Sequence, residues 1–115
     1  MDAGEFDRRI LLQRKVEFDD GLSTVTEGWS DIANVWAKLI PMSGKEILAA
    51  AENAAFANAR FKIRNDSLWS DLNATDRLLF GTSAQHPEGV PHDIVSVRSE
   101  GRGFFLIDAV ARGDS

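Results

Sequence analysis

The sequence has 115 residues, of which 43% are hydrophobic and 27% are charged, a balance typical of a globular protein and not of a wholly disordered one. It contains no cysteine, which excludes disulfide frameworks, thiolate metal sites and cysteine nucleophiles. A formal net charge of -5 argues against tight wrapping of nucleic acid, because such binding neutralises phosphates with lysine and arginine. This net charge does not exclude a protein that forms a wall past which DNA slides.

The chain shows no targeting or membrane segment by its composition. Residues 1–5 are acidic and polar and lack the apolar core of a secretory signal. No apolar stretch approaches the roughly 20 residues that a membrane-spanning helix needs. We therefore expect a soluble, single-domain protein over residues 1–115, large enough to bury a core without disulfides.

The first part of the chain predicts three β-strands. Hydrophobic and polar residues roughly alternate over residues 8–18, and residues 24–29 return with β-branched and aromatic side chains after an Asp-Asp-Gly turn, which predicts a hairpin. Residues 32–40 predict the third strand, with Ala33-Asn34 at the turn before it. This strand places Trp36 in the core and ends at Pro41.

A helix is predicted directly after this strand. Ser43 and Glu46 fit a capping box, in which the serine hydroxyl accepts from the backbone N–H of the glutamate and the glutamate side chain reaches back. The apolar residues that follow are mostly alanine and share one helical face. We expect this inserted helix to occupy residues 43–57.

The second part of the chain again predicts short strands with glycine turns. They are expected at residues 61–64, 77–80, 94–97 and 104–110. Between them, residues 81–91 have glycine and proline punctuation without periodicity and predict a long loop. Five or six short strands with one inserted α-helix indicate a mainly β fold, a small antiparallel β-barrel or sandwich.

No constellation of residues predicts catalysis, a cofactor or a metal site. His86 and His92 flank the predicted loop, but two histidines without a third ligand indicate solvated loop side chains more than zinc. Asp93 lies beside His92, yet no Gly-x-Ser-x-Gly elbow marks a nucleophile and no phosphate-binding glycine loop occurs. An enzyme is therefore the least supported class.

Contact surfaces are better candidates. Trp69 lies in a polar segment between strands and is a candidate for a subunit or partner contact, because tryptophan is enriched at interfaces. The predicted helix either covers one mouth of the barrel or docks against a neighbouring subunit, and its charges also fit a solvated face. The interface candidates at its start and along it are Ser43, Lys45, Glu46 and Glu52.

A family resemblance is carried by the segment from the third predicted strand into the helix. It contains Val35-Trp36-Ala37 followed by Pro41-x-Ser43-Gly44-x-Glu46. Upstream it is accompanied by Gly4-Glu5, Arg9-Ile10, Gln13, Gly21 and Trp29, and downstream by looser echoes at 61–64, Arg77-Leu78 and Asp93-Ile94. This pattern resembles the head-tail joining proteins of tailed phages, also called head-closure or stopper proteins, which occur as well in prophages and gene transfer agents.

The resemblance implies a structural protein of the head-tail connector, with no catalytic activity and no cofactor. In that family a small β-barrel subunit forms a homo-oligomeric ring that seals the DNA-filled head. The partners implied are a portal-side adaptor protein above and a tail terminator or other tail protein below, with double-stranded DNA passing through the channel without sequence-specific binding. The implied location is the neck of a virion or phage-like particle, assembled in the bacterial cytoplasm.

Two features of this reading stay open at the level of sequence. Either the 81–91 loop or the 41–57 insertion is expected to narrow the channel, while the acidic subunit repels phosphate. The loop candidates are Gln85, His86, Glu88 and His92. The alternatives are a small nucleic-acid-binding β-barrel, against which the scattered basic residues argue, and another neck component such as a tail terminator or tail completion protein.

Overall fold

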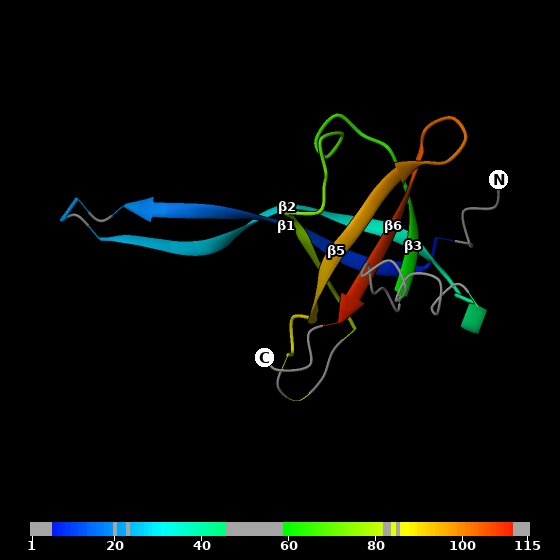
Figure 1. The fold of residues 1–115 in the computed structure, drawn as a ribbon, viewed down its shortest axis with the longest axis horizontal. Coiled ribbons are helices and arrows are strands. Elements are labelled where there is room, and N and C mark those ends of the chain that lie inside the picture. The colour runs from blue at the N-terminus through cyan, green and yellow to red at the C-terminus, as the bar shows by residue number, and fades with distance from the viewer. Residues whose placement is uncertain are drawn as a thin grey trace.

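The computed structural model describes residues 6–19, 21–22, 24–45, 59–81, 84 and 86–111. Its six strands are β1 (Arg8–Asp19), β2 (Val25–Ile40), β3 (Ala59–Arg64), β4 (Arg77–Phe80), β5 (Val90–Ser99) and β6 (Phe104–Ala111). They pair antiparallel in the order β1-β2-β3-β6-β5-β4, and β4 pairs back onto β1, so the sheet closes into a barrel (Figure 1). The prediction of a small antiparallel β-barrel is confirmed.

The core of the barrel follows from the period of two along each strand. On β3, Phe61 and Ile63 are fully buried while the residues between and after them face outward. The largest fully buried side chains come from β1, β3, β4 and β6 and are Phe61, Ile10, Leu12, Ile63, Leu78 and Ile107. The six strands thus enclose an interior filled by side chains and not an open pore.

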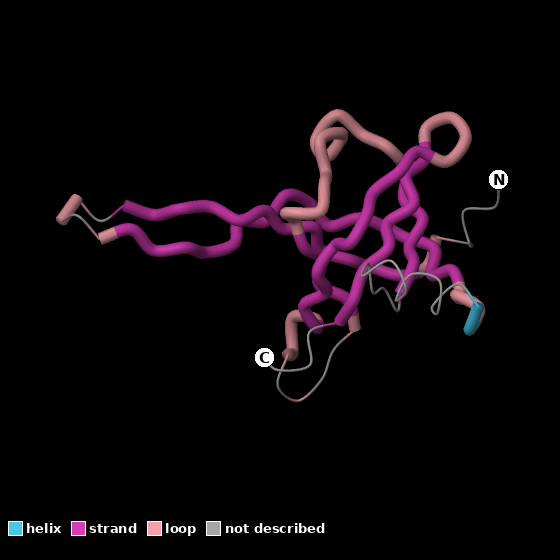
Figure 2. Tube along the Cα trace, viewed as in Figure 1, coloured by secondary structure: helices cyan, strands magenta, loops and turns pink. Residues whose placement is uncertain are grey.

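β1 and β2 are longer than the barrel they help to form. Only residues 11–13 of β1 pair with β4, and only residues 37–40 of β2 pair with β3. Residues 14–19 and 25–30 pair with each other alone and project from the barrel as a two-stranded ribbon, which we call the hairpin arm (Figure 2). The arm gives the molecule its long dimension, with principal extents of 50 × 32 × 29 Å.

The predicted strands at 24–29 and 32–40 are in fact one continuous strand. β2 runs from Val25 to Ile40 without a turn, because the residues expected to turn stay in the ladder, Asn34 opposite Leu11 and Ala33 opposite Leu12. The ladder is irregular at one point: Leu12 and Gln13 of β1 lie opposite Ala33 and Asp31, so β2 has one extra residue there, Ile32. Such a bulge bends and twists the ribbon at the point where the arm leaves the barrel.

The prediction that Trp36 packs in the core is wrong. Its neighbours Val35 and Ala37 face inward and are buried, so alternation places Trp36 on the outer surface, where its side chain is 53% exposed. The guanidinium of Arg9, the cross-strand partner on β1, lies 4.9 Å from the ring centroid. This indole is therefore a surface group held by a cation and not a core group.

The inserted helix is described only at its start. Gly44 and Lys45 are helical, directly after Ser43, as the capping-box pattern predicts. The remainder of the predicted helix, residues 46–57, lies outside the described residues, as do Gln85 and the C-terminal residues 112–115.

The connection between β4 and β5 is shorter than predicted. β5 begins at Val90, whose N–H donates to the carbonyl of Gly81 at 2.8 Å. Pro91 lies in the second position of that strand, close to its start. The hairpin from β5 to β6 forms as predicted, and Gly101 and Gly103 of its turn adopt positive φ angles of 60° and 80°.

Candidate functional site

The predicted contact residues are not gathered at one place within the described part of the chain. Ser43 and Lys45 are exposed just beyond the end of β2, whereas Glu46 and Glu52 lie outside the described residues. Trp69 lies in the turn segment after β3, half-buried against the core. Its indole Nε1 donates to the backbone carbonyl of Arg64 at 2.8 Å, which fixes the ring against the end of β3.

The loop candidates divide in the same way. His86 and Glu88 lie in the β4–β5 connection and line a pocket of about 470 Å³ beside the base of the hairpin arm. His92 lies in β5 and is buried, so the expectation of a solvated loop histidine is wrong for this residue. No group of three or more histidine, aspartate or glutamate side chains with the geometry of a metal site occurs among the described residues.

His92 forms part of the barrel interior. Its ring meets Phe61 and Phe80 edge-on, with centroids 6.3 and 6.1 Å away. Its Nδ1 lies 2.8 Å from the carbonyl oxygen of Val90. Burial lowers the pKa of the imidazole, and the Val90 carbonyl and the nearby charge of Asp93 only partly oppose this effect.

A surface that the sequence did not predict lies on the outside of β2, β3 and β6. Because Phe61 and Ile63 face the core, Lys62 and Arg64 face outward, and Phe104 of β6 lies opposite Arg64 in the ladder. The Lys62 ammonium lies 4.7 Å and the Arg64 guanidinium 5.6 Å from the Phe104 ring centroid. We call this surface the basic-aromatic face and define it by Arg9, Trp36, Lys62, Arg64, Phe6 and Phe104.

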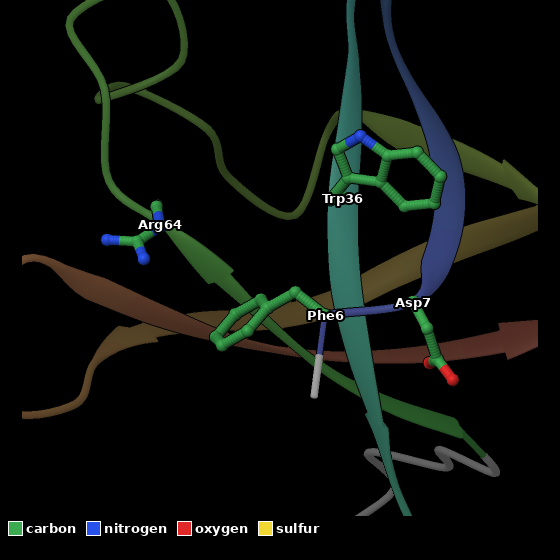
Figure 3. A pocket seen from close by; sticks show the side chains of 4 residues that line it. All are labelled: Phe6, Asp7, Trp36 and Arg64. Carbon is green, nitrogen blue, oxygen red and sulfur yellow. The ribbon is translucent and has the colours of Figure 1, made fainter. Parts of the chain in front are cut away.

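The basic-aromatic face is hollowed between its aromatic groups. A pocket of about 550 Å³ is lined by Phe6, Asp7, Trp36 and Arg64, with Phe6 directed toward Arg64 and Asp7 turned away from it (Figure 3). The Phe6 ring stacks on Phe104 at 5.9 Å, which extends the apolar floor. A second hollow of about 320 Å³ continues past Trp36 to Trp69, so the predicted contact tryptophan borders this surface.

Lys62 and Arg64 of the basic-aromatic face differ in their charge partners from two neighbouring arginines. Arg60 and Arg98, nearby on β3 and β5, bind Asp108 of β6 at 2.7 and 3.2 Å. Burial opposes ionisation of Asp108, yet the hydrogen bonds and charges of the two arginines together lower its pKa. Among the described carboxylates none pairs with Lys62 or Arg64, which therefore present positive charge to the outside.

The end of the hairpin arm has the opposite character. Phe18, Leu22 and Val25 are 56%, 81% and 57% exposed, although all three are large hydrophobic residues. Glu17 and Asp19 flank Phe18 on β1 and are also exposed. We call these five residues the hairpin tip; their sequence gave a strand signal but no sign that the strand continues beyond the barrel.

Among the residues that the structure describes, no helix has the length and apolar character needed to cross a membrane.

Comparison with known proteins supplies a family match. Residues 1–110 match the family model described as phage head completion protein. A solved structure, protein SF1141 from Shigella flexneri 2a, is similar with a TM-score of 0.72 and 25% sequence identity, and the similarity covers 100% of each chain. No curated protein matches the chain.

Proposed function

Because this chain belongs to the phage head completion protein family, we propose that it is a ring-forming stopper, a subunit that seals the DNA-filled capsid and joins it to the tail. Family membership supports a structural protein of the phage particle that has a role in the head-tail connector and works with other head and tail proteins. The observation that supports a ring-forming subunit is a closed barrel with two unlike exposed surfaces, the hairpin tip and the basic-aromatic face. A ring subunit needs two different patches, one for each neighbour.

The proposed partners follow from the same role. The ring would bind a portal-side adaptor on one side and a tail terminator or other tail protein on the other, while double-stranded DNA passes through its channel. Either the β4–β5 connection, with His86 and Glu88, or the 41–57 insertion would narrow that channel. The particle would be a phage, a prophage product or a gene transfer agent, assembled in the bacterial cytoplasm.

A second candidate function has one observation in its favour. Lys62 and Arg64 lie beside Trp36 and Phe104, and cations interleaved with aromatic rings are typical of surfaces that bind single-stranded nucleic acid. The net charge of -5 and the acidic hairpin tip oppose this function. Another neck role, as a tail terminator or tail completion protein, would use the same fold.

The test is electron microscopy of particles from a producer strain that lacks this gene, with and without complementation. Heads without tails, emptied of DNA, would support the stopper assignment. Normal filled and tailed particles would contradict it. Complementation with variants shortened in the 81–89 connection or in the 41–57 insertion then locates the gate, because loss of nuclease-protected DNA is expected from the gating segment alone.

A further inference from the structure

The hairpin tip exposes large apolar side chains on the surface of the monomer. Phe18 and Val25 lie on the part of the ribbon that pairs with no other strand, Leu22 lies in its turn, and each of the three residues is more than half exposed. Because side chains alternate along the ribbon, Phe18 lies on one of its faces and Val25, opposite Asp19, lies on the other. The end of the arm thus exposes large apolar side chains on both faces, which is typical of an interaction site. The Phe18 ring packs close to Gly28, where an added Cβ would lie 2.6 Å from a ring carbon, and this contact holds the phenylalanine on the ribbon.

The base of the hairpin arm is fastened to the barrel. Free two-stranded hairpins are marginal in water, but the base of the arm is tied to the barrel by side chains. Gln13 donates to Asp31 and accepts from Arg77, both at 2.8 Å. The guanidinium of Arg77 also lies 4.2 Å from the ring centroid of Trp29 on the opposite strand of the arm.

The tip cannot reach the basic-aromatic face of its own copy. The ladder from Gln13 opposite Asp31 to Asp19 opposite Val25 extends the arm away from the barrel, by about 20 Å at 3.3 Å for each residue. The face lies on the barrel, at the outer surfaces of β2, β3 and β6 (Figure 1). Any contact between the two surfaces therefore joins two molecules.

The two surfaces match in chemistry. The tip combines exposed apolar side chains with the carboxylates of Glu17 and Asp19, and the face combines aromatic rings with the cations Lys62 and Arg64. Aromatic and arginine side chains dominate binding energy at interfaces, and complementary charge fixes register and suppresses wrong partners. A nucleic acid would use the face but would leave the apolar, acidic tip unexplained.

We propose that the hairpin tip of one copy docks on the basic-aromatic face of a second copy, in a head-to-tail contact that repeats around an assembly. This inference rests on the proposed function only for closure into a ring; the contact itself rests on the two described surfaces. Because the patches differ, the interface is heterologous, and each copy offers one tip and one face.

The absence of natural cysteine makes disulfide trapping a direct test. Thr26 lies opposite Phe18 near the tip, and Asn34 is exposed beside Trp36 on the face. Full-length protein carrying Thr26→Cys and Asn34→Cys is oxidised at high concentration and analysed without reductant. The matched control carries Thr26→Cys with Glu88→Cys, an exposed position in the β4–β5 connection.

A ladder of linked dimers, trimers and larger species from the first variant, with none from the control, supports the contact. Glu17→Lys or Lys62→Glu alone should lower the linked yield about tenfold, and the two together should restore it. Products that stop at a dimer would overturn the head-to-tail arrangement. Binding of duplex DNA that Lys62→Glu abolishes, without any ladder, would assign the face to nucleic acid and overturn the contact.

The same cysteine pair separates this inference from the proposed function. Rings or necks visible in particles that contain the Thr26→Cys and Asn34→Cys variant, but without the cross-link after oxidation, would overturn the contact and leave the stopper assignment standing. A ladder from the purified protein together with normal particles in the deletion strain would support the contact and contradict the stopper.

Discussion

Arg14, at the base of the hairpin arm, forms an ion pair with the buried carboxylate of Asp76, which lies 62 positions further along the chain. Its Nε and Nη2 each donate to one oxygen of Asp76 at 3.0 Å, and its Nη groups also reach Asp71 at 3.0 and 3.1 Å. Asp76 in turn accepts from the backbone N–H of Asn73 at 3.1 Å. The segment between β3 and β4 is thereby fastened to the point where the arm leaves the barrel.

This relationship predicts an asymmetric cost of substitution. Arg14→Ala should destabilise the protein by about 2 kcal/mol, because Asp76 would keep a buried charge without its partner while the exposed part of Arg14 moderates the loss. Arg14→Lys should recover only part of this, since an ammonium cannot form the bidentate pair. Urea denaturation followed by tryptophan fluorescence measures both.

The control for the Arg14 prediction is Asp71→Asn, which removes the exposed partner of the same guanidinium. The Arg14 hydrogen bond lowers the pKa of Asp71, but the carboxylate is solvated, so its loss should change stability little. Equal destabilisation by Asp71→Asn and Arg14→Ala would show that the buried pair is not the important contact.

Two glycines near the β4–β5 connection provide a second prediction. Gly89 has a φ of 125°, and a Cβ there would lie 2.9 Å from the Cβ of Leu79 and 3.3 Å from the backbone. Gly81 has a φ of 73° with nothing within 4 Å of an added Cβ. Gly89→Ala should therefore cost about 3 kcal/mol through strain and overlap, and Gly81→Ala about 1 kcal/mol through backbone strain alone.

Thermal unfolding of the two alanine variants tests this difference. The melting temperature of Gly89→Ala should fall well below that of Gly81→Ala, which itself falls slightly below the parent. If the two variants melt together, the close approach of Gly89 to Leu79 has no energetic importance.

The barrel could be predicted from local patterns, because each strand carries its own period. Phe61 and Ile63 alternate with Lys62 and Arg64, and glycines mark the turn after residue 99, so strand positions and inward faces follow from sequence. The same alternation, applied strictly around Val35 and Ala37, places Trp36 outside. The large apolar side chain of Trp36 favours a core position, but the alternation along β2 places this side chain on the outer surface.

The candidate surfaces could not be predicted, since they depend on strand pairing across long separations. Arg64 meets Phe104 only because β3 pairs with β6, and this register has no local signal. The arm exists because β1 and β2 extend beyond the residues that pair with β4 and β3. The length of a strand pattern in the sequence does not show where this additional pairing ends. The sequence indicates a loop position for His92 because the preceding Pro91 is typical of a loop. In the structure, β5 already begins at Val90, and both residues lie within the strand.

A third prediction concerns Asp108, which lies between two arginines on the outside of the barrel. The side chain of Arg60 is only 15% exposed and that of Arg98 is 48% exposed. Asp108→Asn should cost about 2 kcal/mol, because it removes the charge that the largely buried guanidinium of Arg60 binds at 2.7 Å. Arg98→Gln is the matched change on the exposed side and should cost less than about 1 kcal/mol. Equal midpoints in urea for the two variants would contradict this account.

The last prediction is a pH dependence that comes from His92. Burial among Phe61 and Phe80 lowers its pKa below the ordinary value of 6.5, so the unfolded chain binds a proton more readily than the folded one. The stabilising contribution of neutral His92 is complete above pH 6.5 and falls as the pH drops below that value, levelling off under the folded pKa. The shifted carboxylates Asp71 and Asp108 titrate below 3.8 and leave this window undisturbed.

Urea midpoints measured between pH 7.5 and 5.5 test the role of His92. The parent protein should lose stability toward pH 5.5, whereas His92→Gln should start lower, because the packing between the aromatic rings is disturbed, and then change little across the range. The control is His86→Gln in the β4–β5 connection, which should retain the slope of the parent protein. A slope that persists in His92→Gln and disappears in His86→Gln would assign the proton to the connection and not to the barrel interior.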